Sequence, residues 1–267
     1  MEIFGYVFAL LIGLLMGLIG GGGSILGVPI FVYLFGMDAI SATTISLFVV
    51  GVTSAFGAFG NARQGNVDFK TALFFGIPSV FSVIFMRKIV LPHLPESLIN
   101  IGNLHVAKNV FILVMFAVLM LLSSIKMILG NKKMEAKTVS PQYLLLSTQG
   151  IGVGVITGMI GAGGGFLIIP ALVMLLNIDM KRAIGTSMLI ISFNSLLGFI
   201  SSPKISEIHW GFLIAFTGIS ILGMFFGIQI GKKIDSKKLR PIFGWFVLTM
   251  GIYMMVKEVF SIDMKFF

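Results

Sequence analysis

The chain has 267 residues, of which 57% are apolar and only 11% are charged, and its mean hydropathy is +1.06. Soluble domains carry roughly 25% charged residues, so this composition excludes a water-soluble globular protein. The net charge of +9 does not indicate nucleic-acid binding, because the basic residues lie in short loops between long apolar runs. We therefore predict an all-α integral membrane protein, and the absence of cysteine excludes disulfides and thiolate sites.

The apolar runs predict about ten membrane segments, five in each half of the chain. In the first half we expect them at about 3–19, 24–35, 40–60, 69–85 and 106–129. In the second half we expect them at about 142–160, 166–176, 183–201, 211–230 and 242–259. The second and seventh segments are too short to cross a bilayer, which requires roughly 20 helical residues. The first residues lack a basic region and a cleavage site, so we interpret them as part of the first segment.

A glycine-rich break precedes each short segment. The first break is Gly20-Gly21-Gly22-Gly23, followed by Pro29, and the second is Gly161-Ala162-Gly163-Gly164-Gly165, followed by Pro170. Each glycine costs roughly 1 kcal/mol relative to alanine inside a helix, so both runs predict interruptions within or close to the membrane. A broken apolar segment in corresponding positions of two halves is the best sequence indication of a transporter binding site.

The two halves align without gaps around these breaks at an offset of 141 residues. Matched pairs include Asp38 with Asp179 and Ser54 with Ser195, which compositional bias does not explain. We infer a duplication, with one repeat at 1–130, a basic linker at 131–141 and a second repeat at 142–267. Because each repeat contains five segments, the two must run through the membrane in opposite directions, as inverted repeats.

The distribution of charge predicts the topology. With the linker 131–141 in the cytoplasm, most basic loops also face the cytoplasm, in agreement with the positive-inside rule. Both termini then lie outside the cytoplasm, in a multi-pass protein of the cell (inner or plasma) membrane. Arg87 and Lys88 are an unexplained exception on the outer side. We expect no Arg or Lys deep in an apolar run, so that backbone N–H groups, hydroxyls and amides must bind any charged substrate.

The breaks are candidate anion sites. The residues after each break begin a new helix, whose first N–H groups have no intrahelical partner and favour negative charge. Two such helix starts, at Gly21–Ile25 and Gly163–Leu167, could converge on one anion near the midplane. The alternative is that the glycines only allow close helix packing or bending.

A polar stripe follows each short segment and supplies further candidates. Its residues recur at helical spacing on one face, and their hydroxyl and amide groups donate hydrogen bonds without charge, which suits an anion that must be released. The alternative role for these groups is structural hydrogen bonding between helices. We favour substrate binding most for Asn194, since an unpaired amide has a high free-energy cost in a membrane. The candidate substrate-binding residues are Gly21, Gly22, Gly23, Ser24, Thr44, Ser46, Thr53, Gly163, Gly164, Gly165, Thr186, Ser187, Asn194 and Ser195.

The doubled motif resembles the sulfite exporter TauE/SafE family. The resemblance rests on Gly17–Gly23 leading to Pro29, on its copy at 158–165 leading to Pro170, and on 183–187 after the second short segment. It covers nearly the whole chain and implies a permease that moves sulfite, sulfonates or related small organic acids. The first half departs from the pattern at 42–46, which suggests that the second half carries more of the specificity. A related thiosulfate-uptake branch is built around intramembrane cysteines, so the lack of cysteine argues against that activity.

We therefore expect a secondary transporter that holds a small anion at broken helices and works by alternating access, with the lipid bilayer as its other partner. We expect no cofactor, no metal and no nucleic-acid partner. The exact substrate, the direction of transport, the coupling ion (proton or sodium) and the oligomeric state, including a homodimer, stay open.

Three alternatives differ in class. A passive anion channel on the same scaffold is the first, although the chain lacks the basic rings of an anion pore. An intramembrane enzyme would require an acid–base pair or metal ligands at membrane depth, which the sequence does not offer. A cation transporter would depend on Asp38 and Asp179, for which we prefer a role in capping the following helices.

Overall fold

A computed structural model describes the chain except for residues 1, 96, 102–103, 130–142, 162, 177, 179, 203–204, 206–207, 232, 234–235 and 264–267. Nearly all of the described part is helical, as the composition predicts. The α-helices are α1 (Glu2–Ile19), α2 (Gly27–Tyr33), α3 (Ala39–Arg63), α4 (Phe69–Phe85), α5 (Leu91–His93), α6 (Lys108–Leu129), α7 (Tyr143–Ile160), α8 (Gly165–Leu176), α9 (Met180–Ile200), α10 (Trp210–Gly231) and α11 (Ser236–Asp263).

Three elements depart from a simple series of α-helices. A 3₁₀ helix, η1 (Gly20–Leu26), joins α1 to α2, and a π-helical turn, η2 (Met86–Val90), joins α4 to α5. The antiparallel strands β1 (Ser97–Ile101) and β2 (Leu104–Ala107) form a small hairpin within the connector that precedes α6. The all-α fold class is confirmed, and the hairpin is confined to this connector.

Six helices of the described part are long and apolar enough to cross a membrane. They are Ala39–Arg63, Phe69–His93, Lys108–Ile125, Tyr143–Ile160, Met180–Ile200 and Trp210–Gly231. Shorter apolar helices cover Gly5–Ile19 and Gly23–Tyr33. The chain is therefore a multi-pass membrane protein, and the prediction of about ten segments is confirmed only to the extent of these six spans and the shorter helices.

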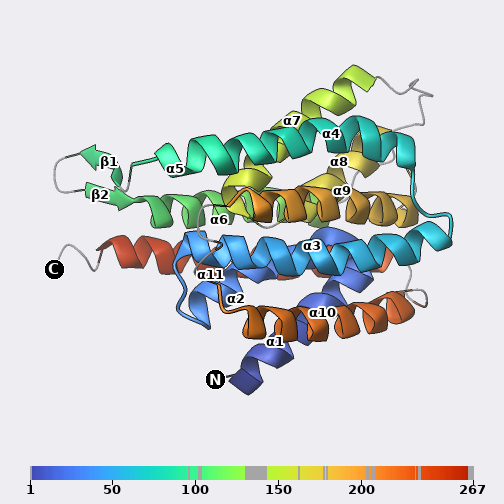
Figure 1. The fold of residues 1–267 in the computed structure, drawn as a ribbon, viewed down its shortest axis with the longest axis horizontal. Coiled ribbons are helices and arrows are strands. Elements are labelled where there is room, and N and C mark those ends of the chain that lie inside the picture. The colour runs from blue at the N-terminus through green and yellow to red at the C-terminus, as the bar shows by residue number, and fades with distance from the viewer. Residues whose placement is uncertain are drawn as a thin grey trace.

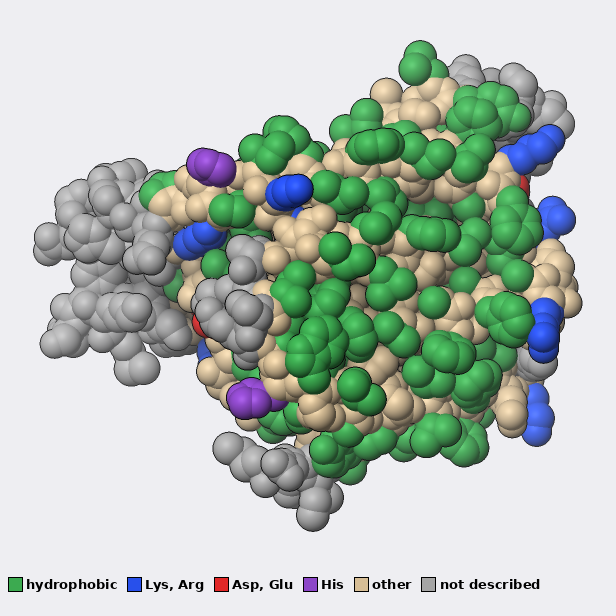
Figure 2. Space-filling view, in the orientation of Figure 1, with side chains coloured by type: hydrophobic (Ala, Val, Ile, Leu, Met, Phe, Trp, Pro, Cys, Tyr) green, Lys and Arg blue, Asp and Glu red, His purple; other side chains and the backbone are tan. Residues whose placement is uncertain are grey.

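The long helices run roughly side by side along the longest axis of the molecule (Figure 1). The β1–β2 hairpin lies at one end of this bundle, and the connection from α3 to α4 lies at the opposite end. Hydrophobic side chains cover the middle of the face shown in Figure 2, whereas Lys and Arg side chains line its right-hand edge and appear again on its left half. This banded surface is what a bundle surrounded by lipid requires.

The two halves of the sequence are interlaced, because the most extensive helix contacts join one half to the other. Helix α1 packs on α10, α4 on α7, α3 on α9, and α6 on α11. Glycines permit close approach in two of these pairs: a Cβ atom on Gly13 of α1 would overlap the backbone of Ser220 in α10, and one on Gly150 of α7 would overlap the backbone of Phe75 in α4. At these two glycines the structure shows the close helix packing that the sequence analysis gives as the alternative role for glycine.

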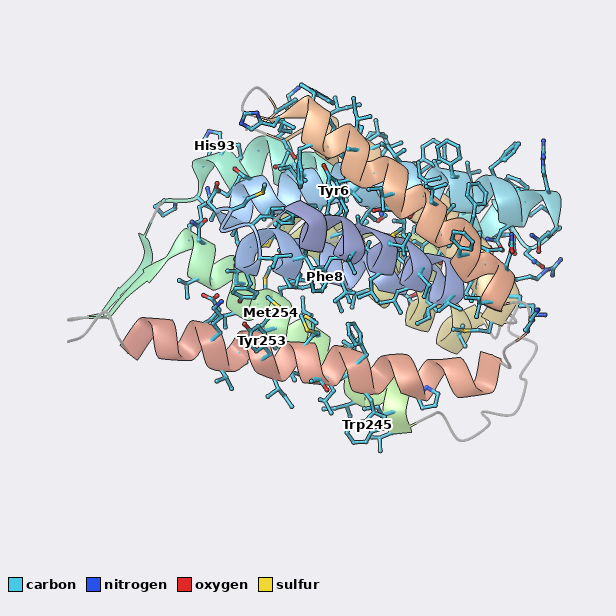
Figure 3. The ribbon with its side chains drawn as sticks, turned by 90° about the horizontal axis from the view of Figure 1, so that it is seen from below. Tyr6, Phe8, His93, Trp245, Tyr253 and Met254 are labelled. Carbon is cyan, nitrogen blue, oxygen red and sulfur yellow. The ribbon has the colours of Figure 1, made fainter. Side chains whose placement is uncertain are left out.

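Helix α11 closes one side of the bundle (Figure 3). It lies along α6, with Met254 fully buried against the other helices and Trp245 exposed on the outside. Buried Met120 and Phe116 of α6 belong to the same apolar core. The central helices α3 and α9 are the most buried of the candidate spans, with 67% of the spanning window inside the protein in each case.

Candidate functional site

The two glycine breaks meet inside the protein, where Gly21 and Gly165 are both buried. A Cβ atom built on Gly165 would overlap the carbonyl group and Cα of Gly21, so no side chain fits between the two backbones. Gly20 and Gly161, which end the two preceding helices, both adopt a positive φ, of 75° and 71°. Glycine is required at such positions because other L-residues rarely adopt this conformation.

The first break is not the free helix start that we expected. Residues 20–26 form η1, and the α-helix begins only at Gly27. Ser24 is buried and its hydroxyl donates to the carbonyl oxygen of Gly21 at 2.6 Å. Gly23 packs against Met16 of α1, and Gly22 lies between Gly21 and Gly23 in the 3₁₀ helix. The segment Gly21–Ile25 is therefore a 3₁₀ helix and not the first turn of an α-helix, and anion binding there stays a prediction.

The second break has a backbone that does not continue as a helix. Gly163 and Gly164 adopt positive φ values of 68° and 72°, and α8 begins directly after them at Gly165. A Cβ atom on Gly163 would lie 2.8 Å from the hydroxyl oxygen of Ser195. One on Gly164 would overlap the hydroxyl of Thr157. The backbone here thus approaches two buried hydroxyls, and anion binding at this break stays a prediction.

Several hydroxyls of the predicted stripes form local hydrogen bonds. Thr44 donates to the carbonyl of Ile40 at 2.8 Å, and Ser187 donates to that of Ile184 at 2.8 Å. Thr186 accepts a hydrogen bond from the backbone N–H of Asp68, so it holds the α3–α4 connection against the start of α9. These three candidates are buried, but their described bonds are structural.

A second group of stripe residues is buried without hydrogen-bond partners. Within the described part of the chain, the hydroxyls of Ser46, Thr53, Ser54 and Ser195 and the Oδ1 atom of Asn194 form no hydrogen bond. The Nδ2 atom of Asn194 donates to the hydroxyl of Ser79 on α4 at 2.7 Å. A buried polar group without a partner costs about 1–3 kcal/mol, so these groups are available to a ligand or to water.

These unpaired groups lie on the two central helices. Gly51 of α3 contacts Leu196 of α9, and Gly57 contacts Met188, so the two helices run antiparallel. This register places Thr53 at about the level of Asn194. The structure therefore brings the two stripes together across the α3–α9 interface.

Arg87 is the residue that sequence analysis missed. It is 0% exposed, and its Nε and Nη2 atoms have no hydrogen-bond partner among the residues described. We expected no Arg or Lys deep in an apolar run, and Arg87, which follows the run 69–85, is nonetheless buried among the helices. Arg87 belongs to η2, where the π-helical turn at the end of α4 directs it inward. The sequence did carry one signal for Arg87, because its predicted place on the outer side makes it an exception to the positive-inside rule.

The guanidinium of Arg87 lies at the second break. Its Nη1 atom is 3.4 Å from the hydroxyl of Ser202, and a Cβ atom on Gly161 would overlap both Nη2 and the side chain of Thr43. At the first break, by contrast, a Cβ atom on Gly20 would meet Ile184 and Ile169. The second break therefore has a cationic neighbour where the first has an apolar one.

The described residues offer little for cation or metal chemistry. They contain no cluster of three His, Asp or Glu residues with metal-site geometry. The exposed Asp38 caps α3, accepting hydrogen bonds from the N–H groups of Ile40 and Ser41 at 3.1 Å each, as predicted. Its counterpart Asp179 and the linker 131–141 lie outside the described residues.

Comparisons with known proteins agree with this architecture. The family model described as "Sulfite exporter TauE/SafE" matches residues 6–254. A probable membrane transporter protein of Xylella fastidiosa is 27% identical over 250 residues, covering 91% of this chain and 90% of that protein. The probable membrane transporter protein YunE of Bacillus subtilis is 25% identical over 277 residues, covering 96% and 99% of the two chains. No solved structure gives a significant match.

Proposed function

Because the chain belongs to the sulfite exporter TauE/SafE family, we propose that it is a secondary transporter of small oxyanions, with sulfite or an organosulfonate as its substrate class. One observation carries the proposal: Arg87 is a buried cation beside the second break, and two of its nitrogens have no partner in the described structure. A buried unpaired charge is costly, and an anion at this position offsets that cost. The planar guanidinium also matches the paired oxygens of sulfite or a sulfonate.

The remaining parts of the site are uncharged. Ser195 and the backbone of Gly163–Gly165 border the second break, and Thr53 and Asn194 follow on the central helices. The hydroxyls donate hydrogen bonds to the anion's oxygens, and Asn194 Oδ1 accepts a hydrogen bond from the O–H group of a protonated oxyanion such as hydrogensulfite. Because most of these contacts are uncharged, the site binds the anion weakly enough to release it.

The proposed architecture is a pair of inverted repeats, 1–130 and 142–267, joined by a cytoplasmic linker at 131–141. The reciprocal helix contacts support it: α1 packs on α10, and the counterparts of these helices, α7 and α4, pack on each other. Gly57 lies beside Met188, and their counterparts Gly198 and Leu47 also lie in contact. Contacts that repeat under the same offset of 141 residues are typical of a two-fold axis in the membrane plane.

Alternating access follows from this arrangement. We place both termini outside the cytoplasm, in the cell membrane, with the first break toward the cytoplasm and the second toward the outside. The pair Gly21 and Gly165 forms the contact at which the two halves meet. Rocking of one set of helices against the other about this contact would open the anion site to one side at a time.

Transport in proteoliposomes tests the proposal. Uptake of radiolabelled sulfite and of a short sulfonate should be saturable in the wild-type protein and lost in Arg87→Gln. It should be unchanged in Arg63→Gln, since Arg63 is exposed on α3 and stacks on Phe59 at 4.3 Å. Wild-type vesicles that transport none of the small oxyanions would overturn the proposal.

Counterflow separates a carrier from a channel on the same scaffold. In a carrier, unlabelled anion on the far side of the membrane accelerates entry of the labelled anion, because the loaded site returns faster than the empty one. In a channel, the labelled flux follows only its own gradient. Absence of this acceleration would favour the channel.

A further inference from the structure

A cavity of about 340 Å³ lies at the end of α9, outside the second glycine break. Its lining consists of Arg87, Lys88, Pro92, Ile200, Ser201 and Ser202. This volume is at the lower end of the range for small-molecule sites, about 300–1,000 Å³. None of the candidate substrate-binding residues predicted from the sequence lines the cavity.

The charge of this cavity is entirely positive among its lining residues. Arg87 and Lys88 supply two cations, Ser201 and Ser202 supply hydroxyls, and Pro92 and Ile200 are apolar. Arg87 is fully buried, whereas Lys88 is exposed. The cavity thus leads from an exposed cation to a buried one, an arrangement that attracts an anion from solution.

The π-helical turn η2 explains how two adjacent basic residues come to line one cavity. Wider turns of this kind are rare and are frequently found at functional sites. In η2 the turn buries Arg87 among the helices and leaves Lys88 at the surface, and both still contribute to the same wall. The unpaired Nε and Nη2 atoms of Arg87 are the second indication of a ligand, since a structural arginine would be expected to satisfy them.

Arg87 belongs both to this cavity and to the second break. It lines the cavity, and its Nη2 atom lies against Gly161, where the chain turns toward α8. An anion bound in the cavity would therefore share one guanidinium with an anion at the break. No other residue of the cavity lining contacts Gly161 so closely.

We propose that this cavity is an outer loading site for a small oxyanion, in which Lys88 captures the anion and Arg87 transfers it to the second break. The inference rests on the proposed transport function and adds a second binding position, on the outer side of the main site. The ligand is a sulfite-sized or sulfonate-sized anion with at least two acceptor oxygens, because the guanidinium binds such groups through two nitrogens. Lys88 contributes mainly to the rate of capture, so its effect weakens as salt screens exposed charges.

Kinetics from the outer side provide the first test. In Lys88→Gln the KM for outside sulfite should rise about three- to tenfold at low ionic strength, with kcat unchanged, and the difference should shrink at high salt. Lys233→Gln is the matched control, because Lys233 is also exposed but lies in the turn after α10. Equal KM values for Lys88→Gln and wild type would overturn the outer site while leaving transport, and hence the proposed function, intact.

The natural absence of cysteine allows a second test that does not depend on transport. Ser201→Cys should react with a membrane-impermeant maleimide added outside, and methanesulfonate or inorganic sulfate should slow the reaction at least threefold; sulfite is avoided because it attacks the reagent. His209→Cys, at an exposed position on the same outer side just before α10 and outside the cavity lining, should be labelled without such protection. Labelling of Ser201→Cys that neither anion slows, in protein that still transports, would contradict the loading site. Loss of transport in the wild type would instead contradict the proposed function.

Discussion

The two glycine breaks have similar sequences and different surroundings. Gly20 and Gly161 occupy corresponding positions and share a positive φ, yet Gly20 faces Ile184 and Ile169 while Gly161 faces Arg87 and Thr43. The first break continues as a 3₁₀ helix, and the second opens through two further positive-φ glycines. Two backbone turns of similar sequence can therefore differ in whether a charged side chain lies beside them.

Removal of this charge should have the largest effect. In Arg87→Gln we expect sulfite transport to fall about 100-fold or more, since deleting one partner of a buried charged interaction costs about 2–5 kcal/mol. Arg87→Lys keeps the charge but loses the two-nitrogen fork, and it should be intermediate. Normal transport by Arg87→Gln would show that the difference between the two breaks has no functional meaning.

The glycine contact between the breaks should be the most sensitive to added volume. In Gly165→Ala the new methyl group would overlap the backbone of Gly21, so we expect a loss of about 1–3 kcal/mol in the free energy of unfolding. Gly152→Ala in α7 is the control, because its added Cβ would meet no described atom within 4 Å beyond the adjoining residues and the backbone of its own helix, and alanine stabilises a helix by up to about 1 kcal/mol. Thermal unfolding in detergent measures both. Equal melting temperatures for the two variants would contradict the contact.

Alanine at the two corresponding turns compares the breaks directly. Gly20→Ala and Gly161→Ala should each lose about 1–2 kcal/mol of stability, because both impose a positive φ on a residue with a side chain. Only Gly161→Ala displaces Arg87, so only this variant should also lose transport per folded molecule, by about tenfold. Uptake normalised to folded protein distinguishes the two, and equal losses would indicate that the breaks act alike.

A similar comparison applies to Asn194 and its counterpart Thr53. Asn194→Ala removes the hydrogen bond to Ser79 as well as a ligand-facing oxygen, and we expect the KM for sulfite to rise about tenfold. Thr53→Ala removes one unpaired hydroxyl and should raise the KM about threefold or less. Unchanged affinity in Asn194→Ala would remove it from the site.

The smallest effect is expected at Asp38. Asp38→Ala removes the cap of α3 and should cost about 1 kcal/mol, which corresponds to a decrease of roughly 2–4 °C in melting temperature for a chain of this size. The KM for the anion should not change. A selective loss of transport without loss of stability would revive the cation-transporter alternative.

The helical bundle, the glycine breaks and the helix faces that carry the polar stripes could be predicted because each depends on a periodic or repeated pattern. Apolar length identifies the spans, and helical spacing identifies the faces on which Thr53 and Asn194 lie. The cap at Asp38 follows from a local preference, and the structure confirms it. These features are set by neighbours within a few turns of the chain.

The burial of Arg87 could not be predicted in this way. It depends on a π-helical turn and on the approach of Gly161 and Ser202, which are distant in sequence. The conformation of the first break was missed for a related reason. Four glycines permit several backbones, and the choice of η1 depends on Gly165, Met16 and Ile191, which pack around them.

The interlacing of the two halves has a consequence for biosynthesis. The partner of α1 is α10, which begins at Trp210, long after α1 ends at Ile19. At a synthesis rate of about 5–20 residues per second, the small-residue face of α1 waits on the order of ten to forty seconds for that partner. During this interval the half-made chain exposes glycine-lined helix faces to lipid or to the insertion machinery, so truncation before α10 should yield a protein that the cell degrades rather than a stable half.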